Sequence, residues 1–259
     1  MDYLEFLAAL HARLEPPTYL EIGIRHGDSL ALACGPAVGI DPAFDLHVEL
    51  GPDVALFRET SDEYFDRDDP LAPFGGEPIA FSFIDGMHLA EFVVRDFASV
   101  ERNAEWNSVV VFDDILPRSA EEAARGRRTL AWTGDVYKVL EVLARRRPDL
   151  TCLTVDTEPT GLGIVLGLDP LCNELREHYD AIVREAVVPD PQHVPDGVLA
   201  RAGALDPDAV LASGVWDLLR AARERGVSRR RGIHGLRRVV KRELGVSVPR
   251  ARLVDLVSA

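Results

Sequence analysis

The stretch Tyr19-Leu20-Glu21-Ile22-Gly23-Ile24-Arg25-His26-Gly27-Asp28-Ser29 contains the pattern that decides the fold. Its apolar run predicts a buried strand over residues 19–24 with an acid inside it. Two glycines four residues apart follow, and residues 27–33 then suit a helix. Glycine lets the backbone approach a ligand closely, because a Cβ there would occupy the ligand's space. We therefore expect a ligand-binding turn between a strand and a helix.

Alternating apolar runs continue on both sides of this turn. Residues 1–16 form a helical pattern that is closed by prolines, and a second apolar stripe predicts a helix over residues 89–101. Further strands are expected over residues 37–40, 54–57, 79–84 and 108–112. Strands that alternate with helices imply a mainly parallel sheet that is covered on both faces.

The pattern changes after the fifth strand. Residues 132–147 read as an amphipathic helix, and apolar runs over 150–155 and 162–168 are separated by a short polar turn. Strands joined so tightly are antiparallel. Five parallel strands followed by a hairpin that adds one reversed strand is the architecture of class I methyltransferases. We therefore predict an α/β, Rossmann-like sheet of seven strands with the last one antiparallel, within residues 1–169.

Residues 170–259 read as a helical and basic C-terminal extension. Helices are expected over residues 175–188, 209–225 and 236–244, with a long loop over residues 187–205. Residues 219–252 hold twelve Arg or Lys against two acids, so this segment carries +10 while the rest of the chain must carry −24 to reach −14. Such a tail can be a solvated helix face, fold back on its own domain, dock a neighbouring subunit or attract an acidic protein partner.

Composition limits the partners and the compartment. The strongly acidic body repels phosphate backbones, so we expect no nucleic-acid partner. No segment approaches the roughly 18 apolar residues of a spanning helix, and the first residues lack the pattern of a secretory signal, so we expect no membrane partner and a cytoplasmic protein. The three cysteines have no metal-ligand spacing and receive no chemical role. A homo-oligomer is expected.

An acid at the end of the first strand suits a cationic ligand. A dinucleotide site would need G-x-G-x-x-G to bring a pyrophosphate to a helix N-terminus, and the chain lacks that spacing. S-adenosylmethionine carries a sulfonium and an ammonium but no phosphate, so Glu21 makes sense beside it. Asp41 ends the second strand, where it can accept hydrogen bonds from ribose hydroxyls. The alternative is a plain structural turn with an unrelated acid.

Cofactor-binding candidates lie at the carboxyl ends of the predicted strands, where open α/β sheets bind ligands. Ser61 and Asp62 follow the third strand and are placed near the adenine. The complete set comprises Glu21, Gly23, Gly27, Asp41, Ser61, Asp62 and Asp85.

Three carboxylates are expected to converge at the same edge of the sheet. Asp85 ends the fourth strand, and Asp113 and Asp114 end the fifth. Like charges that close need a proton or a cation, and ligation by oxygen alone selects a hard ion such as Mg²⁺ or another divalent cation. We predict these three aspartates as metal ligands. The alternative is that Asp113 and Asp114 cap a following helix.

The Asp-Gly-x-His turn at residues 85–88, followed by a strand that ends in two adjacent acids, resembles the Mg²⁺-dependent O-methyltransferases of antibiotic biosynthesis that act on macrolide sugars. The resemblance covers roughly residues 17–168. It implies that Asp85, Asp113 and Asp114 bind the metal and that His88 is the general base, so Asp85 and His88 are the catalytic candidates. The chain departs from the family in Met87 and in its long basic C-terminus.

These residues predict an S-adenosylmethionine-dependent O-methyltransferase that acts on a small hydroxylated acceptor. A metal that binds an alcohol lowers its pKa, and a nearby imidazole can take the proton. Two readings stay open beside it: a metal-independent N- or O-methyltransferase of the same fold, and a non-catalytic protein that recruits an acidic partner through its tail. His88 can equally lie in the first turn of a helix.

Two segments after the fifth strand can be read in two ways. Residues 132–138 combine aromatic, hydroxyl and charged groups, which suits acceptor contact or helix capping and core packing. Arg118 and the arginines within residues 125–128 can close over a substrate or remain solvated.

Overall fold

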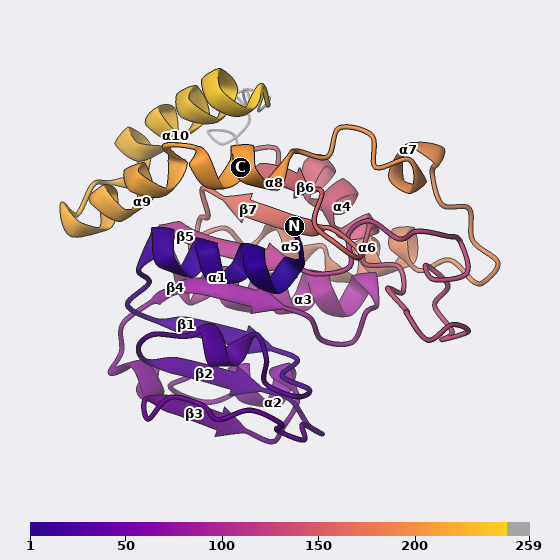
Figure 1. Ribbon diagram of the computed structural model, residues 1–259, viewed down its shortest axis with the longest axis horizontal. Helices are drawn as coiled ribbons and strands as arrows, with labels where there is room; N and C mark the ends of the chain where they lie inside the picture. The colour runs from indigo at the N-terminus through magenta and orange to yellow at the C-terminus, as the bar shows by residue number, and fades with distance from the viewer. Residues whose placement is uncertain (248–259) are drawn as a thin grey trace.

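The computed structural model describes residues 1–247. Its centre is a seven-stranded sheet in the order β3-β2-β1-β4-β5-β7-β6 (Figure 1). Every neighbouring pair is parallel except β5–β7 and β6–β7, so β7 alone runs against the others. This is the class I methyltransferase fold, as predicted. The strands are β1 (Tyr19–Ile22), β2 (Ala37–Ile40), β3 (Val54–Phe57), β4 (Ile79–Ile84), β5 (Ala104–Phe112), β6 (Thr151–Val155) and β7 (Leu162–Leu166).

Helices cover both faces of the sheet, and each face has its own hydrophobic core (Figure 1). One face carries α2 (Ser61–Phe65), α3 (Ala90–Arg102), α4 (Lys138–Arg146), α5 (Glu174–Glu177) and α6 (Tyr179–Ala186). The other carries α1 (Tyr3–Leu14), α8 (Pro207–Ala212), α9 (Val215–Glu224) and α10 (Arg229–Leu244). The remaining short elements are η1 (Leu30–Leu32), η2 (Ala72–Phe74) and α7 (Asp196–Leu199).

The first helix follows directly from its sequence. Asp2 accepts a hydrogen bond from the Leu4 amide, and the Glu5 side chain accepts one from the Asp2 amide, which completes a capping box. The buried stripe of α1 packs on the sheet, and the helix ends at Glu15, which adopts a left-handed conformation just before two prolines. Both ends of α1 are therefore set by its local sequence.

Several helices differ from their predicted bounds. Residues 27–33 contain only the single 3-10 turn η1, and the helix predicted from residue 132 begins at Lys138, because Gly134 has a positive φ of 55°. The helix predicted over 175–188 is broken into α5 and α6, and that over 209–225 into α8 and α9 at an extended Ser213. Helix α10 starts earlier than predicted, and the predicted loop over 187–205 contains α7.

The C-terminal helices belong to the same core as the sheet. Trp216 of α9 and Leu236 of α10 are fully buried in a cluster that includes Trp106 of β5 and Leu166 of β7. Residues 248–252 of the predicted basic segment lie outside the described residues. Within residues 1–247, no helix has the length and apolar character that a membrane crossing requires.

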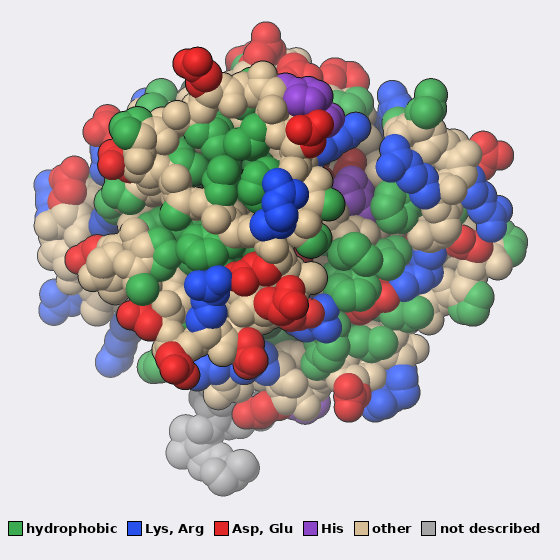
Figure 2. Space-filling view, turned by 90° about the horizontal axis from the view of Figure 1, so that it is seen from below, with side chains coloured by type: hydrophobic (Ala, Val, Ile, Leu, Met, Phe, Trp, Pro, Cys, Tyr) green, Lys and Arg blue, Asp and Glu red, His purple; other side chains and the backbone are tan. Residues whose placement is uncertain are grey.

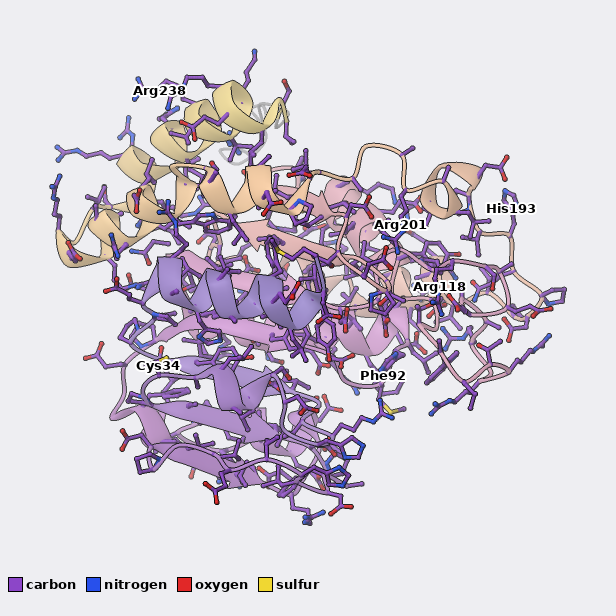
Figure 3. All side chains as sticks on the ribbon, in the orientation of Figure 1. Cys34, Phe92, Arg118, His193, Arg201 and Arg238 are labelled. Atoms are coloured by element: carbon purple, nitrogen blue, oxygen red, sulfur yellow. The ribbon has the colours of Figure 1, made fainter. Side chains whose placement is uncertain are left out.

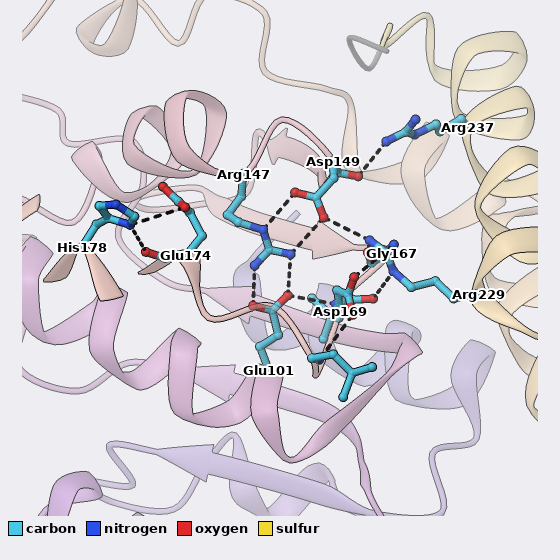
Figure 4. A network of polar contacts seen from close by, with 11 residues as sticks. Glu101, Arg147, Asp149, Gly167, Asp169, Glu174, His178, Arg229 and Arg237 are labelled. Carbon is cyan, nitrogen blue, oxygen red and sulfur yellow. Dashed lines mark hydrogen bonds and ion pairs between the residues drawn. The ribbon is translucent and has the colours of Figure 1, made fainter. Parts of the chain in front are cut away.

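A buried polar network joins α10 to the opposite layer (Figure 4). Arg147, 2% exposed, pairs with the equally buried Glu101 and with Asp149 at 2.9 Å. Arg229 reaches Asp149 at 3.0 Å and Asp169 at 3.2 Å from the first turn of α10. This network fixes where the basic helix begins.

Candidate active site

A cavity of about 440 Å³ opens at the carboxyl ends of β1, β2 and β4. Its volume falls in the range of small-molecule sites, about 300–1,000 Å³, and it lies where open α/β sheets bind ligands. Six predicted site residues line it, together with residues of α3 and the loop after β2. These six are Gly23, Asp41, Ser61, Asp62, Asp85 and His88.

Gly23 allows three strand ends to meet in the floor of this cavity. Its amide donates to the Ile40 carbonyl at 2.8 Å, and its φ is +88°. A Cβ at this position would lie 2.1 Å from the carbonyl oxygen of Asp85. The glycine is therefore required by backbone packing and by its left-handed conformation.

Gly27 has a different role. Its φ is +90°, and a Cβ would meet Leu46 at 2.9 Å and Val48 at 3.1 Å, beneath the loop that follows β2. It does not line the cavity. The second glycine of the motif therefore allows the turn to pack against the loop that follows β2.

Glu21 lies beneath the turn and is completely buried. Its two carboxylate oxygens accept hydrogen bonds from the Tyr19 hydroxyl and the Ser29 hydroxyl, both at 2.7 Å. Burial raises the pKa of Glu21 to about 8, against the hydrogen bonds that lower it. Because Glu21 does not line the cavity, its contacts brace the glycine turn from within.

Asp41 holds the rim of the same turn. One carboxylate oxygen accepts hydrogen bonds from the Ile24 and Arg25 amides at 3.0 and 2.9 Å, and the other accepts from the Ala43 amide at 2.7 Å. Arg25 takes a positive φ of 47° under this constraint. Asp41 thus lines the cavity where the sequence predicts it, with its oxygens on backbone amides.

The far wall of the cavity is formed by α2 and α3. The Ser61 hydroxyl donates to Asp96 at 2.5 Å, and Asp62 forms an ion pair with Arg95. Burial raises the pKa of Asp96 to about 7. The sequence analysis missed Asp96, although an acid at the spacing of the apolar stripe of α3, between Val93 and Val100, was the available signal.

An acidic cluster adjoins the cavity at the ends of β4 and β5. One potential ligand atom from each of Asp85, His88 and Asp114 lies within 4.8 Å of the other two. His88 Nδ1 is 2.6 Å from an Asp114 oxygen, and Nε2 is 3.4 Å from an Asp85 oxygen. The Nδ1 contact is not aligned as a hydrogen bond, so this buried nitrogen has no hydrogen-bond partner.

Asp113 is not part of that group, although the sequence predicts it as a third ligand. Its side chain accepts a hydrogen bond from the Asp114 amide at 2.8 Å. Burial, and then the neighbouring carboxylates, raise the pKa of Asp85 and Asp113 well above the ordinary value. His88 and Asp114 both have positive φ, of 53° and 62°. For residues other than glycine, such angles mark backbone strain, which concentrates at functional sites.

The segment 132–138 packs directly on this cluster, in line with the capping and packing alternative. Trp132 stacks on the His88 ring with centroids 5.2 Å apart, and a Cβ on Gly134 would meet the His88 carbonyl oxygen at 1.7 Å. The buried Asp135 caps α3 by accepting from the Ala90 amide at 2.9 Å. The same carboxylate pairs with Arg125 at 2.9 Å.

Two of the arginines that were expected either to close over a substrate or to remain solvated form ion pairs with neighbouring acids instead. Arg118 pairs with Glu122, and Arg125 pairs with Glu91 as well as with Asp135. Figure 3 shows Arg118 and Phe92 on the same side of the molecule, far from Arg238 on α10. These pairs fasten the loop after β5 to the start of α3.

Tyr3 is a further residue that the sequence analysis missed. Burial raises the pKa of its phenol, and Asp113 and Asp85 raise it further because their charges oppose ionisation. Its ring stacks on Phe83 of β4, with centroids 6.4 Å apart. Helix α1 therefore contributes a phenol close to the acidic cluster.

No family model matches the chain, and no curated protein does so either. Among solved structures, the O-methyltransferase TomG from Streptomyces achromogenes, involved in tomaymycin synthesis and solved with S-adenosylmethionine, is 21% identical with a TM-score of 0.47. The match covers 63% of this chain and 79% of that one. An O-methyltransferase from Bacillus cereus, solved with S-adenosylhomocysteine, is 15% identical with a TM-score of 0.44, over 63% of this chain and 80% of that one. The order and direction of its own seven strands give this chain the class I methyltransferase fold.

Proposed function

We propose that the chain is an S-adenosylmethionine-dependent O-methyltransferase for a small hydroxylated acceptor, and that a divalent cation, Mg²⁺ or a similar ion, assists it. The observation that carries the proposal is the position of the cavity. One cavity joins the glycine turn and Asp41 to Asp85 and His88. A cofactor pocket and a set of groups able to handle an acceptor hydroxyl are therefore continuous.

The residues of the cavity fit the cofactor. Gly23 lets the backbone at the ends of β1 and β4 come together in the floor, and Asp41 sits at the end of β2, where ribose hydroxyls can reach its carboxylate. Ser61 and Asp62 line the wall where an adenine would lie, with Asp96 behind them. When bound, S-adenosylmethionine supplies a methyl group on a positively charged sulfur. The chain contributes alignment of the acceptor with that methyl group, which can supply much of the rate.

The acidic cluster fits a cation. Asp85 and Asp114 offer carboxylate oxygens that lie close together, and Asp113 lies beside them. When bound, a divalent cation lowers the pKa of a hydroxyl that it binds and orients two adjacent hydroxyls. We assign to His88 Nε2 the removal of the acceptor proton, with the ring held by Trp132. We infer a sugar or natural-product acceptor because such molecules carry the adjacent hydroxyls that a cation at this position could bind.

The proposal is tested by measuring S-adenosylhomocysteine release with catechol and polyol acceptors, in excess chelator and after Mg²⁺ is restored. Asp114→Asn should lower kcat by about a hundredfold or more, because a charged ligand is lost. Asp45→Asn, an exposed change on the loop after β2, should leave kcat unchanged. Full activity in excess chelator and in Asp114→Asn would rule out the role of the cation.

One observation favours a second candidate, a methyltransferase of the same fold that works without metal. The 2.6 Å approach of Asp114 to His88 Nδ1 places a negative charge beside the ring, which would stabilise the imidazolium that forms when His88 accepts a proton. This candidate predicts activity that survives chelator but is lost in His88→Gln. The two candidates are therefore separated by the same assay.

A further inference from the structure

A groove of about 250 Å³ lies between α9 and α10, away from the cavity. Its lining is mostly apolar, and two arginines stand at its rim. The side chains that matter here are Trp106, Leu218, Ala221, Val227, Arg225 and Arg231. Trp106 lies near the beginning of β5, whereas the acidic cluster follows the end of that strand. The groove is therefore at the opposite edge of the sheet from the active site.

Glycines in α10 create this groove. A Cβ on Gly232 would lie 1.9 Å from the Trp106 ring, so the helix can rest on the indole only because that side chain is missing. The indole nitrogen donates to the Val227 carbonyl at 2.6 Å, which fixes the ring in the floor. Gly235 is half-buried and also lines the groove. A glycine inside a helix lowers its stability by about 1 kcal/mol relative to alanine. At Gly235, no close approach to another part of the backbone requires a glycine.

The cations of residues 225–241, two of which line the groove, fall into two groups. Arg229 and Arg237 bind Asp149, Asp169 or nearby carbonyl oxygens and belong to the structural network (Figure 4). A second group is exposed and forms no ion pair within residues 1–247, and Figure 3 shows one of its members, Arg238, pointing outward from α10. This second group comprises Arg225, Arg230, Arg231, Arg238 and Lys241.

We propose that the groove between α9 and α10 docks an acidic helix of a partner protein. An apolar side chain of that helix enters the groove, and its carboxylates pair with Arg225 and Arg231. Arginines without ion pairs beside an apolar floor are complementary to a ligand that has both acidic and apolar side chains. The positive patch also stands on a body of opposite charge, so it directs an acidic partner to this one edge of the molecule.

Other occupants fit less well. A membrane would need an exposed apolar helix face, but Leu236, Val239, Val240 and Leu244 of α10 are buried. Nucleic acid offers no apolar side chain and would be repelled by the acidic remainder of the chain. Exposed Asp66, Asp68 and Asp69 follow α2, and Figure 2 shows acidic side chains, interspersed with basic ones, on the face of the molecule that is seen from below. Pairing that face with the groove of another copy would be head-to-tail and would not close into a dimer.

The test uses the full chain and a fluorescently labelled synthetic helix with glutamates on one face and leucines on the other. Binding is followed by anisotropy at low and high salt, beside a matched peptide that has glutamine in place of glutamate. We expect the glutamate peptide to bind in a salt-sensitive manner and the glutamine peptide to bind at least about tenfold more weakly. Duplex DNA and vesicles of phosphatidylglycerol are titrated in parallel.

Two kinds of variant test separately how the arginine charges and the apolar groove contribute to peptide binding. Arg225→Glu/Arg231→Glu and Ala221→Leu should each weaken binding by about tenfold or more, the first by repulsion and the second by filling the groove. Arg184→Glu, an exposed charge reversal on α6, should have no effect. Thermal melts confirm folding, and Leu218→Gln replaces Ala221→Leu if that variant melts early. Unchanged binding in either the charge or the groove variant, or tighter binding of DNA or vesicles than of the glutamate peptide, would overturn the proposal.

Discussion

At Gly23, the close approach of two strand ends in the floor of the cavity depends on the absence of a side chain. We expect Gly23→Ala to cost about 2 kcal/mol or more of unfolding free energy, because the new Cβ meets Asp85 and the left-handed φ is strained. Affinity for S-adenosylmethionine should fall by about tenfold or more in the same variant. Denaturation and titration calorimetry measure the two effects.

Gly35→Ala provides the matched control. A Cβ at Gly35 meets nothing within 4 Å, and its backbone needs no positive φ. Its stability and affinity should equal those of the wild type. Equal behaviour of the two alanine variants would show that the close approach at Gly23 is not what shapes the pocket.

We expect Asp96 to make the stability of the fold depend on pH. The unfolded side chain ionises near its ordinary pKa of about 3.9, whereas the folded one keeps its proton up to about 7. Between these values the unfolded chain binds fewer protons, so the unfolding free energy falls as pH rises, by at most about 1.4 kcal/mol per pH unit for this group. Glu21, with a folded pKa of about 8, acts in the same direction.

Asp96→Asn should therefore flatten part of this slope. Asparagine still accepts the Ser61 hydrogen bond, so packing is kept while the titration is removed. Denaturant midpoints from pH 4 to pH 8 measure the slope in both proteins, with exposed Asp66→Asn as the control. If stability depends on pH equally in Asp96→Asn and in the wild type, Asp96 does not cause this pH dependence.

Individual site residues were predictable where a strand end fixes them. Gly23, Asp41, Asp85 and Asp114 lie where the sequence places them, because parallel strands deliver their ends to one edge. Asp96, Tyr3 and the stacking of Trp132 on His88 were not predicted as site contacts, because they depend on how helices and a long loop fold back. Contacts between segments that are distant in the sequence cannot be inferred from local sequence patterns.

At the scale of elements, the buried pair of Arg147 and Glu101 joins the end of α4 to α3. Arg147→Ala should lower the unfolding free energy by about 3 kcal/mol or more, because Glu101 would be left charged and buried without its partner. Arg145→Ala is the control, since that side chain is half-exposed and lies 3.8 Å from Glu141. It should cost at most about 0.5 kcal/mol. Equal losses in the two variants, measured by denaturation, would contradict the structural role of the network.

The strands were predicted more accurately than the helices. Each expected strand is present, and the central strands β1, β4, β5 and β7 were marked by continuous apolar runs because they are buried on both faces. Helix ends were missed where tertiary contacts override periodicity, as at Gly134, which must approach His88, and at Ser213, which turns the chain between α8 and α9. The reversed β7 was predictable because the turn before it is short.

At the scale of the whole molecule, the two sites that we propose lie at opposite edges of one sheet. The cavity and the acidic cluster are at the carboxyl ends of the strands, and the groove is beside the amino end of β5. A partner bound at the groove would thus leave the cavity accessible. The expectation of a homo-oligomer stays a prediction.

The central claim is that the cavity between Gly23, Asp41 and Asp85 binds S-adenosylmethionine. Titration calorimetry of the purified chain with S-adenosylmethionine and with S-adenosylhomocysteine tests it directly. The account predicts that each binds at one site per chain and that Gly23→Ala weakens both. An absence of binding by either compound, with the wild-type protein folded, would contradict it.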